Sequence, residues 1–163
     1  MLKNLLAKPI ESNLNGAVHS ELFASHLYKH LATKLQRLGF FGAQKHFLSE
    51  SADELEHYQK IADFMNDRGA IAAMPQIEAM DETVTTLRDA IEIAFETELQ
   101  LEKDYTRWYR AAMSEDPITA QFLLGFLEIQ RKSVGEYGDL LARLDRAGKN
   151  EAAILIIDKE LGE

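Results

Sequence analysis

Six polar side chains interrupt the apolar stripes of this sequence, and all are of types found at metal centres. They are Glu21, Tyr28, Glu54, His57, Glu98 and Gln130. The first two are seven residues apart, and Glu54-Leu55-Glu56-His57 is an E-x-x-H motif. Residues three or seven apart share one face of a helix, so these groups would point the same way as their apolar neighbours. Each also lies near the middle of its segment, which would bring all six to one level of a helical bundle.

Three carboxylates at that level would need compensation. Burying an unpaired ion costs several kcal/mol, and neighbouring carboxylates raise one another's pKa. The stripes carry no lysine or arginine near their middles. Carboxylates with one imidazole and no thiolate suit iron, manganese or zinc. The pattern therefore predicts a pair of metal cations, and carboxylate-bridged iron would favour oxidation of Fe(II) by oxygen.

Each feature taken alone has a simpler interpretation. A lone glutamate on a stripe usually lies at its edge, and a lone mid-helix histidine is more often hydrogen-bonded in the core. Tyr28 would by default be a core aromatic, and E-x-x-H is common because both residues are ordinary in helices. The combination on four segments favours the metal centre.

Other polar and aromatic residues carry weaker signals. His26 and His30 are four residues apart but lie off the stripe, so we expect a solvated pair. Trp108 and Tyr105 are expected in the core, whereas Glu102 could approach the metals. Three acidic residues of the second segment are either secondary iron sites or a charged helix face: Glu50, Asp53 and Glu56.

The elements that must position these residues are helices. Apolar residues recur at steps of three and four, and no segment alternates as a strand would. We expect long helices at about 10–38, 42–68, 83–114 and 118–146, followed by a short one at about 151–161. Four long helices with apolar stripes must pack together in water, so the fold class is an all-α four-helix bundle.

Loop lengths indicate how the helices connect. The links at residues 39–42 and 114–117 are short and predict antiparallel neighbours. Residues 69–82 include Pro75 and lack a helical pattern, so they can run the length of the bundle. One such crossover makes the second and third helices parallel.

Composition bounds the remaining possibilities. The chain has 163 residues, enough for one domain with a substantial core. Its net charge of -9 disfavours nucleic acid as a partner and suits cations. The absence of cysteine excludes disulfides and thiolate metal sites. No apolar run is long enough for a membrane span, and we expect a cytoplasmic protein.

On these residues the sequence resembles the bacterial non-haem ferritins over nearly its whole length, from Leu14 to Leu161. That family has the same first-helix Glu and Tyr, second-helix E-x-x-H, third-helix Glu and fourth-helix Gln. The resemblance implies a ferritin-like bundle and a dinuclear ferroxidase centre that oxidises Fe(II) with O2 or H2O2. The residues it implicates are Glu21, the bridging Glu54, His57, Glu98, and the supporting Gln130 and Tyr28. It also implies a cage of twenty-four subunits that stores ferric mineral, with the fifth helix near the four-fold axes.

The sequence departs from that family in places. Bacterial ferritins often hold a third iron with fourth-helix glutamates, but the matching residues are Ile129, Lys132 and Ser133, and Asp53 is the one clear survivor. A third iron site is therefore expected to be absent or altered. Haem is not expected, because Leu55 replaces the haem-binding methionine of bacterioferritins and the fourth segment lacks a second E-x-x-H.

Two further departures concern the fourth helix. The acids that line three-fold channels correspond by equal spacing to Ala120 and Leu123, which leaves the access route for iron undefined. Glu128 and Arg131 also have i, i+3 spacing, and a small register error would bring Glu128 nearer the metals.

Iron storage with ferroxidase activity is the leading hypothesis among four. A dinuclear-metal oxidoreductase acting on peroxide or an organic substrate commonly needs a second E-x-x-H. A DNA-protecting mini-ferritin would have a basic tail and ligands shared between subunits. A purely structural cage subunit would have no reason to keep the four ligands Glu21, Glu54, His57 and Glu98.

Overall fold

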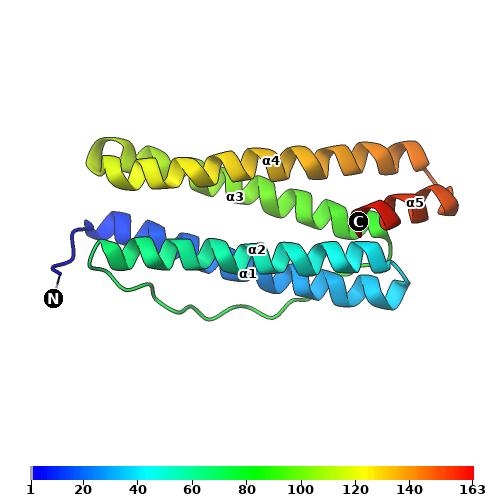
Figure 1. The fold of residues 1–163 in the computed structure, drawn as a ribbon, viewed down its shortest axis with the longest axis horizontal. Helices are drawn as coiled ribbons and strands as arrows, with labels where there is room; N and C mark the ends of the chain where they lie inside the picture. The colour runs from blue at the N-terminus through cyan, green and yellow to red at the C-terminus, as the bar shows by residue number, and fades with distance from the viewer. Residues whose placement is uncertain (1) are drawn as a thin grey trace.

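A computed structural model describes residues 2–163 and contains five helices (Figure 1). They are α1 (Lys8–Leu38), α2 (Phe41–Asp67), α3 (Leu87–Glu115), α4 (Pro117–Ala147) and α5 (Glu151–Leu161). Across residues 2–163 there is no strand, so the all-α class is confirmed. The segment between α2 and α3 runs along the α1–α2 pair from one end of the bundle to the other, which confirms the crossover (Figure 1).

Two helices begin where local signals place them rather than at the expected residues. The first begins at Lys8 instead of about residue 10, because Pro9 is accommodated in the first turn. The third begins at Leu87, not 83. There the Thr86 side chain accepts a hydrogen bond from the Asp89 amide, while the Asp89 carboxylate accepts one from the Thr86 amide. This capping box fixes the start of α3 and lengthens the crossover.

The core lies along the facing stripes of the four long helices. Leu14, Leu31, Phe47 and Ile91 are fully buried in it, each contributing about 2 kcal/mol through the apolar area removed from water. Helix α1 packs mainly on α2, and α3 packs mainly on α4. No helix within residues 2–163 is both long and apolar enough to cross a membrane. Buried apolar residues lie before and after the mid-helix polar residues along these helices, so the polar residues are enclosed by apolar side chains.

The short helix α5 closes one end of the bundle by capping α2. Phe40, at the N-cap of α2, provides no side-chain hydrogen bond. The buried Asp158 of α5 supplies it instead, accepting from the amides of Ala43 at 2.7 Å and Gly42 at 3.2 Å. Gly42 is required at this approach, because a Cβ there would lie 1.7 Å from the carbonyl oxygen of Asp158.

Candidate metal centre

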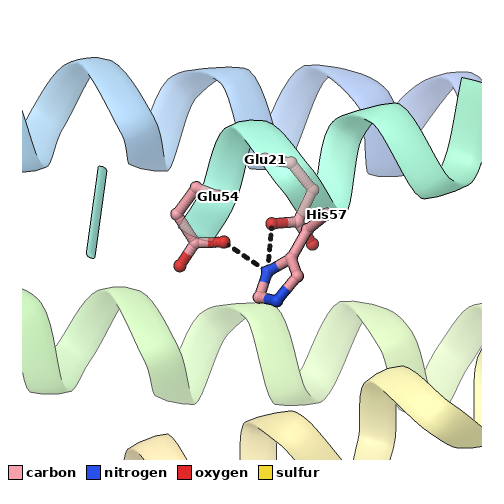
Figure 2. A group of neighbouring side chains, drawn as sticks. All are labelled: Glu21, Glu54 and His57. Carbon is pink, nitrogen blue, oxygen red and sulfur yellow. Dashed lines mark hydrogen bonds and ion pairs between the residues drawn. The ribbon is translucent and has the colours of Figure 1, made fainter. Parts of the chain in front are cut away.

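Side chains from α1 and α2 form a compact group of potential metal ligands in the bundle interior. Glu21 and Glu54 are buried and His57 is half-buried. The His57 Nδ1 atom lies 2.8 Å from Glu54 Oε2 and 3.4 Å from Glu21 Oε2 (Figure 2). One ligand atom from each residue lies within 4.8 Å of the other two, so one cation could contact all three.

A second group is centred on the buried carboxylate of Glu98 in α3. Tyr28 of α1 donates its hydroxyl hydrogen to Glu98 Oε1. Gln130 of α4 donates an amide hydrogen to Glu98 Oε2 at 3.0 Å. Both oxygens of Glu98 therefore have hydrogen-bond donors, and Glu98 is not part of the three-residue group around His57. All six sequence-predicted residues lie in the interior, divided between these two groups.

Tyr105 lies in the core, as expected from the sequence, and in addition contacts the site. It is fully buried on α3 and donates its hydroxyl hydrogen to Glu21 Oε1. The two tyrosines make matching contacts between α1 and α3. Tyr28 of α1 donates to Glu98 of α3, and Tyr105 of α3 donates to Glu21 of α1. A signal was present in the sequence: Tyr105 follows Glu98 by seven residues, as Tyr28 follows Glu21.

Burial and crowding alter the acidity of the three carboxyl groups. Burial, reinforced by the neighbouring Glu21, raises the pKa of Glu54 well above its ordinary value. Burial also raises the pKa of Glu98 to about 7. Burial opposes ionisation of Glu21 as well, but the neighbouring Glu54, His57 and Tyr105 side chains outweigh it and lower its pKa. Burial therefore favours the protonated form of Glu54, whereas Glu21 favours the carboxylate that a cation would bind.

Three buried acceptor atoms within residues 2–163 lack hydrogen bonds. Two of them belong to the candidate ligands, Glu21 Oε2 and Gln130 Oε1, and the third is Glu82 Oε2 in the crossover. Leaving such an atom unsatisfied costs about 1–3 kcal/mol, so native interiors rarely keep them without a reason. Oxygen donors with one imidazole fit Fe(II), Mn(II) or Zn(II), and this donor set contains no sulfur ligand. The residues present thus suit hard or borderline divalent cations.

Comparison with known proteins agrees with this arrangement. A family model described as a ferritin-like domain matches residues 11–147. The chain belongs to the ferritin family. A bacterial non-heme ferritin from Bacteroides fragilis is 27% identical over 160 residues, covering 98% of this chain and 99% of that protein. A ferritin from Pacifastacus leniusculus is 32% identical over 157 residues, covering 91% of this chain and 84% of that protein.

The fold agrees with that of solved ferritins. An open-pore ferritin from the archaeon Archaeoglobus fulgidus matches with a TM-score of 0.93 at 25% identity, over 96% of this chain and 98% of that one. Five helices in the same arrangement confirm the ferritin-like bundle with its crossover. Membership places this chain among the iron-storage proteins.

The structure also places the residues that depart from other ferritins. Ala120 and Leu123 are buried, so in this chain they face the core and not a channel surface. Glu128 is exposed and pairs with Arg131 at 2.9 Å, whereas Gln130 points inward. This fixes the register of α4 and excludes Glu128 as the inward-facing residue.

The remaining polar residues named from the sequence lie outside this ferritin site. Asp53 and Glu56 are exposed on α2, and Glu102 does not join the three-residue group found within residues 2–163. His26 is exposed, as expected, and its Nδ1 atom bonds the Leu22 carbonyl oxygen. His30 differs from the expected solvated partner, because it is half-buried with Nε2 3.3 Å from the carbonyl oxygen of Glu82 in the crossover.

Proposed function

We propose that this ferritin stores iron by oxidising Fe(II) at an intra-subunit dinuclear centre and depositing ferric mineral inside a multi-subunit cage. The ligands assigned to iron are Glu21, Glu54, His57, Glu98 and Gln130. Glu54 is assigned as the bridge between two ions. The observation that carries the proposal is the buried group of Glu21, Glu54 and His57, with one carboxylate oxygen lacking a hydrogen bond.

The proposed residues act mainly by exchanging protons for iron. Burial raises the pKa of Glu54 well above its ordinary value and that of Glu98 to about 7, so at neutral pH Glu54 holds a proton and Glu98 is partly protonated. Binding Fe(II) releases these protons and leaves carboxylates, which stabilise Fe(III) better than Fe(II) because they are hard, anionic donors. Two ferrous ions then give up one electron each, and dioxygen with two protons becomes hydrogen peroxide.

Tyrosines are assigned a positioning part in this proposal. Tyr28 and Tyr105 each hold one oxygen of a candidate ligand, and burial raises both pKa values so that the hydroxyls remain donors. Such partners fix the orientation of ligands and typically change metal affinity about 10–100-fold when removed. Twenty-four subunits, as the family resemblance implies, would enclose the mineral.

Iron retained per chain after aerobic Fe(II) loading and gel filtration tests the proposal. We expect many irons per chain at the elution volume of a cage. His57→Ala and Glu54→Ala should slow oxidation strongly while assembly persists, and the exposed Glu56→Ala is the matched control on α2. Retention of about two irons per chain would indicate a dinuclear enzyme without storage. Unchanged oxidation in both site variants would refute the assigned centre.

A further inference from the structure

Three unlike donor side chains meet at the seam between α2 and α4, outside the site described above. His46 and Glu50 are one helical turn apart on α2, and Tyr137 comes from α4. The Tyr137 hydroxyl oxygen lies 3.3 Å from His46 Nε2 and 3.3 Å from Glu50 Oε2. The phenol therefore stands between an imidazole nitrogen and a carboxylate oxygen.

These spacings are long for hydrogen bonds but suit ligands of one ion. Hydroxyl hydrogen bonds to oxygen usually span about 2.5–3.0 Å, so a phenol that is 2% exposed has only stretched partners here. Two ligands about 2.1 Å from a common ion at octahedral to tetrahedral angles lie about 3.0–3.4 Å apart. Both separations around Tyr137 fall in that range.

The surroundings hold the donors in place and admit solvent. Tyr137 stacks on Phe47, with ring centroids 6.3 Å apart and an interplanar angle of 12°. The ring of His46 meets Tyr137 edge to face at 5.9 Å. An open pocket of about 400 Å³ is lined by His46, Tyr137, Glu136 and Asp139 among others. An ion could therefore reach His46 and Tyr137 from the α2–α4 surface, with Glu50 behind them bonded to the Tyr137 hydroxyl.

Burial disfavours the charged form of all three donors, so a bound cation would have to displace protons from two of them. Burial lowers the pKa of His46, so the imidazole is neutral and its nitrogen lone pair is free for a metal. Burial, followed by the charge of Asp53, raises the pKa of Glu50 to about 7. Burial keeps the Tyr137 phenol protonated by raising its pKa. The negative charge of Glu136 raises the pKa of Glu50 further.

We propose that His46, Glu50 and Tyr137 form a second iron site, selective for Fe(III) and separate from the dinuclear centre. A phenolate and a carboxylate are hard anionic donors, which favour trivalent over divalent iron. When the bond between Fe(III) and the phenol oxygen forms, the O–H bond breaks and its proton leaves to solvent through the pocket. The geometry alone carries this assignment of a binding site.

The position of His46, Glu50 and Tyr137 indicates a role for this second site in iron transfer, and that role rests on the proposed function. Glu50 is one helical turn from Glu54 along the same face of α2. Ferric ions leaving the dinuclear centre would meet His46, Glu50 and Tyr137 next. The site is then a holding point for Fe(III), in place of the third iron site whose fourth-helix glutamates this chain lacks.

The test is a titration of metal-free protein with Fe(III)-nitrilotriacetate, followed in the visible region. Ferric ion bound to a phenolate gives a charge-transfer band there, so the wild-type protein should develop one band with one bound ion per chain. Tyr137→Phe keeps the ring and its stacking and should lose both the band and that ion. Tyr28→Phe and Tyr105→Phe, matched variants at the dinuclear centre, should keep them.

A His57→Ala background separates this proposal from the proposed function. There Fe(II) oxidation should fail while the Fe(III) band persists. If the band survives Tyr137→Phe or disappears in Tyr28→Phe, the band belongs to the dinuclear centre and the proposal of a second site is overturned. Absence of any band in folded wild-type protein would also overturn it. A protein that shows the band but never oxidises Fe(II) would refute only the proposed function.

Discussion

Replacing Glu98 with glutamine should stabilise the metal-free protein at neutral and alkaline pH. The side chain of Glu98 is 1% exposed, and burial raises its pKa from 4.5 to about 7. Below pH 4.5 the carboxyl is protonated in the folded and unfolded chains, so it carries no penalty. Between pH 4.5 and 7 the unfolded chain ionises first, and stability falls as the pH rises. Above pH 7 the full difference amounts to about 3 kcal/mol.

The substitution also fits the hydrogen-bond network. Tyr28 can still donate to the amide oxygen of the new side chain. The Gln130 Oε1 atom has no partner in the wild-type protein, so rotation of that amide lets it accept from the new amide nitrogen. Glu98→Gln therefore removes a buried charge, and the rotation exchanges the unsatisfied Gln130 Oε1 for an unsatisfied Nε2 without adding to the number of such atoms.

Chemical denaturation of metal-free protein between pH 4 and pH 8, with elution volumes compared to match assembly, measures the effect. The variant should gain about 3 kcal/mol at pH 8, roughly 6–12 °C in Tm, and nothing at pH 4. Added Fe(II) or Zn(II) should stabilise the wild type more than the variant, since ligands shift stability by mass action. Equal stability at pH 8, or a gain that does not depend on pH, would refute the reasoning.

Three further predictions concern the cap on α2 and the tyrosine beside Glu21. Asp158→Ala should weaken docking of α5 by about 2 kcal/mol, because it removes two charge-assisted hydrogen bonds from the amides of Gly42 and Ala43. Hydrogen exchange in residues 151–161 should become faster, and Asp158→Asn should give an intermediate rate. Gly42→Ala should release the same residues, because its Cβ would meet the Asp158 carbonyl oxygen at 1.7 Å, and unchanged exchange would contradict the contact. Tyr105→Phe should leave the fold intact but weaken Fe(II) binding about tenfold in anaerobic titrations; unaltered affinity would mean that Tyr105 does not orient Glu21.

The helical periodicity of apolar residues accounts for most of the fold and site features that can be predicted from the sequence. Steps of three and four residues determine which side chains face the core, so the apolar pattern alone places Glu54, Glu98 and Gln130 inside the bundle. The same rule places Tyr105 inside but not beside a glutamate, because apolar periodicity treats a tyrosine as an ordinary core residue. Its seven-residue spacing from Glu98 repeats the Glu21–Tyr28 pattern and distinguishes it from the other core aromatics.

Contacts between distant segments cannot be predicted in this way. A stripe fixes the face of a helix but not the rotamer, so it does not tell that Tyr28 binds Glu98 while Tyr105 binds Glu21. The cap that Asp158 provides to Ala43 joins residues 115 positions apart and has no local pattern. In contrast, the start of α3 is encoded locally by its capping box, and apolar periodicity alone places it several residues too early.

The division of the interior into two groups follows from how hydrogen-bond donors are distributed. Glu98 receives donors on both oxygens, whereas Glu21 receives one and keeps Oε2 without a hydrogen bond. A cation arriving at Glu21, Glu54 and His57 displaces only a shared proton, while one arriving at Glu98 must compete with Tyr28 and Gln130. The instability of the metal-free site and its readiness to bind cations therefore have the same cause, which is three carboxylates buried beside a single imidazole, that of His57.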